Sequence, residues 1–201
     1  MTPYAELATA TNFSFLRGAS PGPNLVLTAL LLGHGGIGIA DRNTVAGVVR
    51  AWTALRDLRE HGLPSPEKIR EGGSPGEYLW LENPAFENLP LTAPQLEAMA
   101  KEFKLATGSR LVFADGTPDI IAYPANRAGW GRLCRLLSQG NLRAGKGDCI
   151  LHLDDLLADA RDLLLIVMPG RSDDGLATVL ARLDDAAPGA VWLGASMHRR
   201  G

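Results

Sequence analysis

This sequence of 201 residues has little net charge, only two cysteines and no long apolar run. The formal net charge is −2, which argues against a dedicated nucleic-acid clamp, because such proteins carry a clear basic excess. The only cysteines are Cys134 and Cys149, and neither forms a CxxC pair or has a histidine at ligand spacing. We therefore expect reduced, partly buried thiols rather than a disulfide or a zinc site.

No stretch is long enough to suggest a membrane span. The longest apolar runs, such as Leu25–Leu32 and Leu163–Met168, fall far short of the roughly 20 residues that a spanning helix needs. The first residues lack a basic region followed by an apolar core, so we expect no signal peptide. With 46% apolar and 21% charged residues, the composition is typical of a soluble globular protein, and we predict a cytoplasmic location with no membrane partner.

Short apolar runs alternate with amphipathic stretches, a pattern that predicts an α/β fold, barrel-like or open. The predicted strands are Tyr4–Ala8, Ile37–Ala40, Ser109–Phe113, Pro118–Tyr123, Leu163–Met168 and Ala190–Leu193. The predicted helices are Leu25–Gly33, Val45–His61, Thr92–Leu105, Asn126–Leu137, Leu153–Ala160 and Asp173–Leu183. Fully apolar strands, Leu163–Met168 above all, are expected where helices cover both sides of a sheet.

Local signals support several of these predictions. Asn24 can cap the helix that follows it, and Asp115-Gly116 is a good hairpin turn between two strands. Thr92 begins a predicted capping box. The Pro- and Gly-rich stretch 63–92 breaks the pattern, and we interpret it as an excursion from a single domain that spans residues 1–201.

One apolar stripe stands out in the predicted helix Val45–His61. It consists of Val45, Val48, Val49, Trp52 and Leu55. Their spacing is that of one helix face, which predicts that this face is buried against the rest of the domain.

Three segments together carry a resemblance to a known family. Residues 4–20 read YAELATATNFSFLRGAS, residues 37–50 read IGIADRNTVAGVVR, and residues 126–137 read NRAGWGRLCRLL. In this order they resemble the polymerase and histidinol phosphatase (PHP) domain at the N-terminus of bacterial C-family DNA polymerases (the alpha subunit of DNA polymerase III), in particular the error-prone branch. Similarity runs through most of residues 4–200 and is weakest over 63–92.

The resemblance implies a fold and a function. The family domain is a distorted βα barrel, and this chain resembles its first two-thirds, so we expect an incomplete barrel of PHP type. The implied function is a structural and partner-binding module in DNA replication, DNA repair or translesion synthesis. The implied partners are the remainder of a polymerase chain or other replication and repair proteins, with DNA contacted only indirectly.

Metal-binding members of the family carry a His-x-His pair, an Asp-His pair and a later Glu, which hold zinc or manganese. Matched to those motifs, this chain has Ala8 and Ala10, then Asp41 followed by Arg42, and finally Arg110. Alanine offers no donor atom, and a guanidinium stays protonated and repels a cation. The resemblance therefore implies a degenerate site, of which only Asp41 is retained, with no metal cofactor and no catalytic residue expected.

The three charged residues Asp41, Arg42 and Arg110 allow two interpretations. In the first, they hold an anion such as phosphate; in the second, they form an ion-pair cluster that ties loops together, which is the commoner arrangement. Whether the chain is an enzyme stays open, because the parent would be a DNA-directed DNA polymerase while this chain alone is expected to be non-catalytic.

Two other functions remain as alternatives. The first is a residual metal-dependent phosphoesterase that uses Asp41, His152 and either Asp154 or Asp155. The second is a standalone binding protein that holds an anion with Arg42 and Arg110. Against the first, His152, Asp154 and Asp155 look like the first turn of a helix. The remaining histidines, His34, His61 and His198, stand at helix ends or near the end of the sequence, where capping or exposure is expected.

Overall fold

The computed structural model describes residues 4–62, 93–170 and 175–195, which form six strands and six helices. By their internal contacts the residues divide into two compact units, one of residues 1–39 and 46–106, the other of residues 40–45 and 107–201. The predicted excursion at 63–92, the predicted cap Thr92 and His198 lie outside the described residues.

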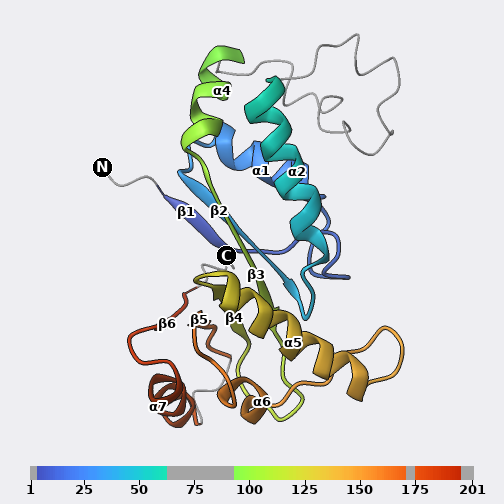
Figure 1. Cartoon of the computed structure of the whole chain (residues 1–201), viewed down its shortest axis with the longest axis vertical. Coiled ribbons are helices and arrows are strands. Elements are labelled where there is room, and N and C mark those ends of the chain that lie inside the picture. The colour runs from blue at the N-terminus through green and yellow to red at the C-terminus, as the bar shows by residue number, and fades with distance from the viewer. Residues whose placement is uncertain (1–3, 63–92, 171–174, 196–201) are drawn as a thin grey trace, which may run out of the picture. The chain divides into compact units, whose positions relative to one another are not determined.

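The first unit contains two parallel strands and three helices (Figure 1). Its elements are β1 (Ala5–Thr9), α1 (Gly22–Leu31), most of β2 (Gly36–Arg42), α2 (Ala46–His61) and α4 (Ala93–Glu102). Fully buried side chains from these helices, including Leu30, Leu55 and Leu96, form its core. Arg59 of α2 donates from Nε to the Ala100 carbonyl at 2.8 Å, so α2 satisfies an acceptor at the end of α4.

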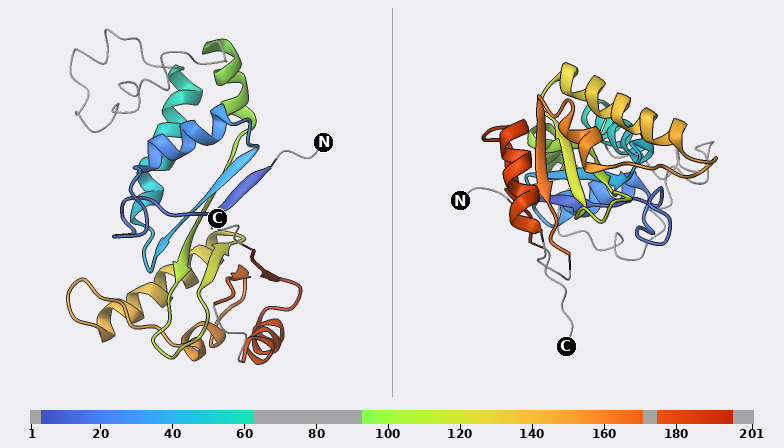
Figure 2. Two further views of the ribbon diagram at one scale, coloured as in Figure 1. Left: turned by 180° about the vertical axis from the view of Figure 1, so that it is seen from behind. Right: turned by 90° about the horizontal axis from the view of Figure 1, so that it is seen from below.

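The second unit is built on an antiparallel hairpin followed by two further strands. Its elements are β3 (Lys104–Leu111, mostly in this unit), β4 (Ile120–Pro124), α5 (Arg127–Arg143), α6 (Leu153–Leu157), β5 (Leu163–Val167), α7 (Leu176–Ala186) and β6 (Val191–Leu193). β5 pairs antiparallel with β4 and parallel with β6. Helix α5 lies along β4, as the two views of Figure 2 show.

One apolar core fills this second unit. It combines β-strand residues with one face of α5 and with the segment around α6, and its fully buried members are Leu111, Ile120, Ala122, Leu133, Leu151, Leu165, Val167 and Leu183. The hairpin predicted around Asp115-Gly116 is confirmed. There Asp115 Oδ1 accepts the Thr117 N–H at 3.1 Å, and Gly116 adopts a φ of 84° that only glycine reaches easily.

The predicted fold class is confirmed. The strand order is β1-β2-β3-β4-β5-β6, and a mixed α/β chain whose strands follow sequence order is consistent with an incomplete βα barrel. The expectation of two unpaired, partly buried thiols is also confirmed for Cys134 and Cys149. No helix among the described residues is long and apolar enough to cross a bilayer.

Several predicted element boundaries are wrong, among them the start of β3, which is Lys104 rather than Ser109, and the end of α5, which is Arg143 rather than Leu137. Helix α1 begins at Gly22, not at Leu25, with Pro21 as its N-cap. Pro23 stands in the first turn, where proline is well tolerated, so Asn24 lies inside the helix. The predicted helix up to Leu105 ends at Glu102, because the Lys104 N–H donates to the Gly35 carbonyl at 2.9 Å and begins β3.

Two predictions of burial are also wrong. In α2, Val49 and Trp52 are exposed, and the buried face carries Gly47 and Ala51 instead. Gly22 of α1 lies against this face, since a Cβ built on it would meet the Ala51 Cβ at 3.1 Å. The small residues allow the two helices a close approach. In β5, Leu164 is 39% exposed while its neighbours are buried, so this strand is not covered on both sides as expected.

Candidate functional site

The candidate site begins with the two alanines at the His-x-His positions. Ala8 lies in β1, and Ala10 follows the end of that strand. The Glu6 carboxylate accepts the Ala8 N–H at 2.7 Å, and the register of β1 against β2 shifts between Glu6 and Thr9. The chain is therefore irregular where two ligands of one strand would have to point in the same direction.

The retained carboxylate, Asp41, is fully buried at the end of β2, in the second unit. Its backbone carbonyl accepts the Ser109 hydroxyl at 2.9 Å, and Ser109 is itself fully buried. A buried polar group needs a hydrogen-bond partner, and Ser109 supplies one from a position 68 residues further along the chain. No local pattern of residues indicates this pairing in advance.

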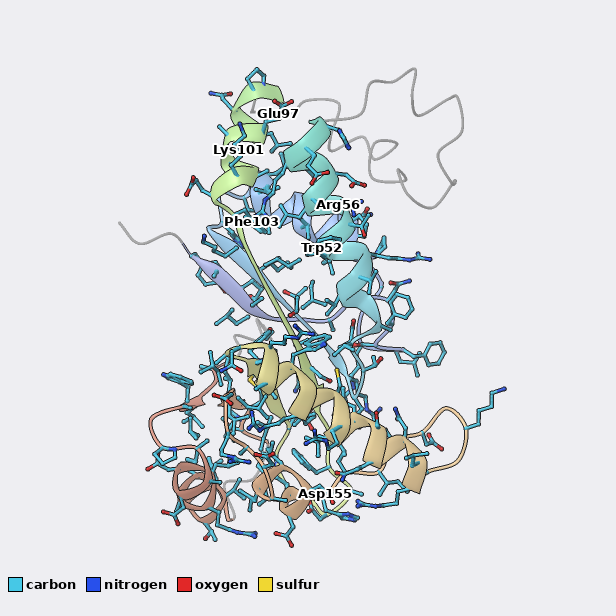
Figure 3. All side chains as sticks on the ribbon, in the orientation of Figure 1. Trp52, Arg56, Glu97, Lys101, Phe103 and Asp155 are labelled. Carbon is cyan, nitrogen blue, oxygen red and sulfur yellow. The ribbon has the colours of Figure 1, made fainter. Side chains whose placement is uncertain are left out.

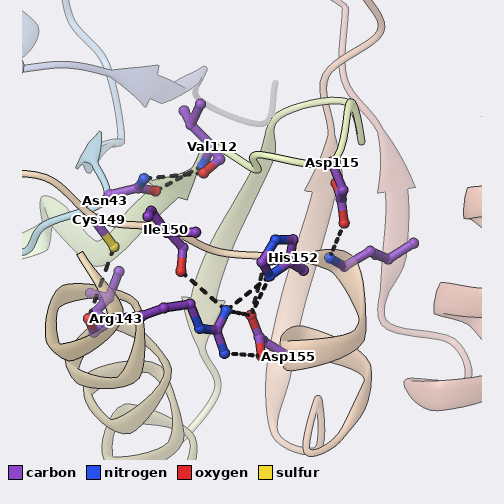
Figure 4. Close-up of polar contacts among 10 residues, drawn as sticks. Asn43, Val112, Asp115, Arg143, Cys149, Ile150, His152 and Asp155 are labelled. Carbon is purple, nitrogen blue, oxygen red and sulfur yellow. Dashed lines mark hydrogen bonds and ion pairs between the residues drawn. The ribbon is translucent and has the colours of Figure 1, made fainter.

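A third polar residue continues the contact between the two segments. Asn43 exchanges two side-chain hydrogen bonds with the Val112 backbone, at 3.1 and 2.8 Å, while its own N–H donates to the Arg110 carbonyl at 2.9 Å (Figure 4). Its φ of 49° lies in the left-handed region, which asparagine tolerates better than most residues. An asparagine directly after a strand was the available signal, and sequence reasoning missed it.

Arg110 has a carboxylate partner that was not part of the predicted cluster. Its Nε donates to Asp119 Oδ2 at 2.7 Å, and both side chains are half-buried. Asp119 directly precedes β4, so the hairpin brings the two residues together. The hydrogen bonds above thus place residues 41–43 beside residues 109–112, while Ala8 and Ala10 belong to the other compact unit.

Of the residues of the alternative phosphoesterase, His152, Asp154 and Asp155 lie at the start of α6, whereas Asp41 lies in β2. Arg143 forms a two-point ion pair with Asp155, at 2.6 and 2.9 Å, and its NH1 also lies 2.9 Å from His152 Nδ1 (Figure 4). Asp154 accepts from Arg182 at 2.5 Å. The expected helix start is confirmed, because Asp155 also accepts the His152 N–H at 2.9 Å.

The other histidines have structural surroundings. His34 follows α1, and its backbone N–H donates to the Ala29 carbonyl. Its ring packs edge-on against the Tyr4 ring with the centroids 4.9 Å apart. His61 is the last residue of α2, and its side chain is largely exposed. Across residues 4–62, 93–170 and 175–195, no three His, Cys, Asp or Glu residues are grouped so that they could hold a metal ion.

The Asp155 ion pair leads to a pH prediction. The hydrogen bonds from Arg143 hold the pKa of Asp155 at about 2, below its ordinary value of 3.8. A lowered pKa in the folded state means that the ionised carboxylate stabilises the chain above about pH 4, and that this stabilisation is lost as the pH falls towards 2. We expect the urea midpoint of the native chain to fall more steeply over this range than that of Asp155→Asn. Equal slopes would contradict the prediction.

Comparison with curated proteins shows what this chain is similar to. It is 42% identical to error-prone DNA polymerase 1 of Rhizobium meliloti over 98% of its own length and 14% of that protein. It is 41% identical to the error-prone DNA polymerase of Brucella abortus, over 100% of its own length and 15% of that protein. It is 40% identical to the error-prone DNA polymerase of Ruegeria pomeroyi, over 96% of its own length and 17% of that protein.

These relatives are error-prone DNA polymerases. The present chain is homologous to one part of them, and it spans only about a seventh of the length of the Rhizobium and Brucella proteins. A scan of the sequence against protein-family profiles finds no match.

Proposed function

We propose that this chain is the N-terminal, PHP-like part of an error-prone DNA polymerase, in which it acts as a structural and partner-binding module during damage-tolerant synthesis. The observation that carries the proposal is the identity of about 40% to error-prone DNA polymerases along nearly the whole chain. The motifs at residues 4–20, 37–50 and 126–137 support the assignment to a PHP-like domain within such a polymerase.

The side chains at the former ligand positions support a role without metal catalysis. Ala8 and Ala10 have no donor atoms, and Arg110 forms an ion pair with Asp119, so its permanent positive charge is fixed in place. A metal that hydrolyses phosphate esters needs several nitrogen or oxygen ligands converging on it. Asp41 is the one member of the family's ligand set that remains.

The edge of the second unit supports a role as part of a larger protein. β6 stands at the end of the strand order, and its Trp192 and Leu193 are about half exposed, while Leu164 of the adjacent β5 is partly exposed. Apolar side chains next to a sheet edge favour covering by further protein. In the proposed polymerase, the residues that complete the barrel would cover this edge.

A replacement experiment tests the function directly. In the Rhizobium meliloti polymerase, the matched segment is exchanged for this chain, and primer extension is measured beside the native enzyme and a deletion of the same segment. We expect the chimera to retain most of the activity and the deletion to lose it. A chimera as inactive as the deletion would contradict the proposed function.

Metal content provides a separate prediction. After dialysis against zinc or manganese and then against buffer, the 201-residue chain is expected to retain well under one equivalent of metal and to show no metal-dependent phosphodiesterase activity. One equivalent of metal, together with an activity lost in Asp41→Asn, would favour the phosphoesterase instead. The chimera and the metal measurement are independent of each other.

A further inference from the structure

The first compact unit carries an exposed apolar surface on two neighbouring segments. The residues that define this loop–helix surface are Phe13, Phe15 and Leu16 of the loop between β1 and α1, and Val49 and Trp52 of α2. Phe15 is 81% and Leu16 89% exposed, and Trp52 projects from α2 beside Arg56 (Figure 3). Single exposed apolar residues are common, but five from adjacent segments usually mark a binding surface.

The loop holds these side chains outward through its own hydrogen bonds. The Ser14 N–H donates to the Thr11 carbonyl at 2.9 Å, and the N–H groups of Arg17 and Gly18 both donate to the Ser14 carbonyl at 2.9 Å. Thr11 and Ser14 are buried, and a Cβ on Gly18 would lie 2.6 Å from the Ala10 carbonyl oxygen. Thr11 and Ser14 are therefore buried beneath the loop, while the apolar side chains of Phe13, Phe15 and Leu16 are exposed beside them.

Leu16 adds a conformational cost to this arrangement. Its φ of 61° is in the left-handed region, which is unfavourable for a bulky side chain such as leucine. A strained, exposed leucine is understandable if its side chain has a binding role, since the backbone then fixes the direction in which it points.

Two arginines connect and border the surface. Arg50 of α2 lies with its guanidinium carbon 5.9 Å from the centroid of the Phe13 ring, and Arg56 lies 5.0 Å from that of Trp52. Arg56 also pairs with Asp57 at 2.7 Å, whereas no carboxylate of the described residues pairs with the exposed Arg50. A partner that carries a carboxylate beside an apolar contact would therefore complement both the rings and Arg50.

We propose that the loop–helix surface binds a second, apolar and acid-bordered surface formed by the rest of the polymerase chain. This inference rests on the proposed function, under which most of the protein lies outside the present 201 residues, because the chain matches only 14% of its Rhizobium relative. Most of the possible contact surface therefore belongs to those further residues.

The chemistry of the surface favours protein over nucleic acid. Leu16 and Val49 have no π face on which a base could stack, and Arg56 is already paired with Asp57, so its charge is not free for a phosphate. A contact between apolar side chains with an arginine at the edge is typical of the interface between protein domains. Nucleic acid and a second copy of this chain are treated as competing outcomes of the test.

Hydroxyl-radical footprinting of the chimera described above tests the proposal. The oxidation rates of Phe15, Leu16 and Trp52 are compared between the free chain and the chimeric polymerase, by mass spectrometry of the same peptides. We expect a fall of at least about five-fold in the chimera for all three, because buried interface residues lose contact with solvent. A chimera that extends primers while these residues react as in the free chain would overturn the proposal and leave the proposed function standing.

The same experiment separates the competing occupants. Protection that appears only when primer–template DNA is added would assign the surface to nucleic acid, and protection that grows with concentration of the free chain would assign it to self-association. Either result contradicts the proposal. Protection in an inactive chimera would support the surface and count against the proposed function, so the two failures are distinguishable.

A variant pair gives a second readout. Phe15→Asp combined with Leu16→Asp places two charges on the surface, and in the chimera it is expected to speed proteolytic release of this chain at least about ten-fold. The matched control is Leu142→Asp at the end of α5, where the leucine is 88% exposed but lies outside the loop–helix surface. Equal proteolysis of the double variant and the control would overturn the proposal.

Discussion

Leu165→Ala is expected to lower the free energy of unfolding of the second unit by about 2–5 kcal/mol. Leu165 is fully buried in the middle of β5, where it is paired with Ala122 of β4 and Val191 of β6. Removing its branched end leaves a cavity among residues of α5, α6 and the neighbouring strands, which close packing prevents from collapsing. Urea unfolding of the 201-residue chain, followed by circular dichroism, measures the loss.

The adjacent residue of the same strand provides the control. Leu164 is also leucine, but its side chain points to the opposite face and is 39% exposed. Leu164→Ala changes the β propensity by the same amount as Leu165→Ala but removes much less buried apolar area. We therefore expect it to lower the free energy of unfolding by less than about 1 kcal/mol. Equal losses in the two variants would show that the core of the second unit does not lie where the structure places it.

Much of the fold was predictable because its signals are local. Apolar runs bounded by glycine and proline located all six strands, and the Asp-Gly turn located the β3–β4 hairpin. The errors arose where packing with distant residues decides the outcome. Apolar spacing alone assigned Trp52 to the buried face of α2, but the close approach of α1 selects the face that carries Gly47 and Ala51.

The candidate site was predictable in its residue types but not in its contacts. The absence of ligands at Ala8 and Ala10 can be read directly from the sequence. The partner of Arg110 cannot, because its pairing with Asp119 depends on the hairpin register that sets Arg110 opposite Ile121. The ion-pair cluster of Asp41, Arg42 and Arg110 therefore stays a prediction, in which Arg110 has Asp119 as a further partner.

Gly129→Ala is the second substitution with a large expected effect. Alanine normally favours a helix over glycine, yet here a Cβ would overlap the Asp162 carbonyl oxygen. That carbonyl cannot move away easily, because it accepts the Ala125 N–H at 2.8 Å and the Asp162 side chain pairs with Arg132 at 2.6 Å. We expect a loss of about 1–3 kcal/mol in the free energy of unfolding, as overpacking forces the start of α5 away from the 160–163 turn.

Gly131→Ala is the matched control, because it makes the same change two residues later in the same helix. A Cβ there meets nothing within 4 Å, so only the helix propensity changes, and the variant should gain about 0.5–1 kcal/mol. Opposite signs for the two variants in the same urea experiment are therefore the expected result. A stabilising Gly129→Ala would mean that α5 is not held against Asp162, and that the residues at 126–137 lack the close contact that explains a glycine at this position.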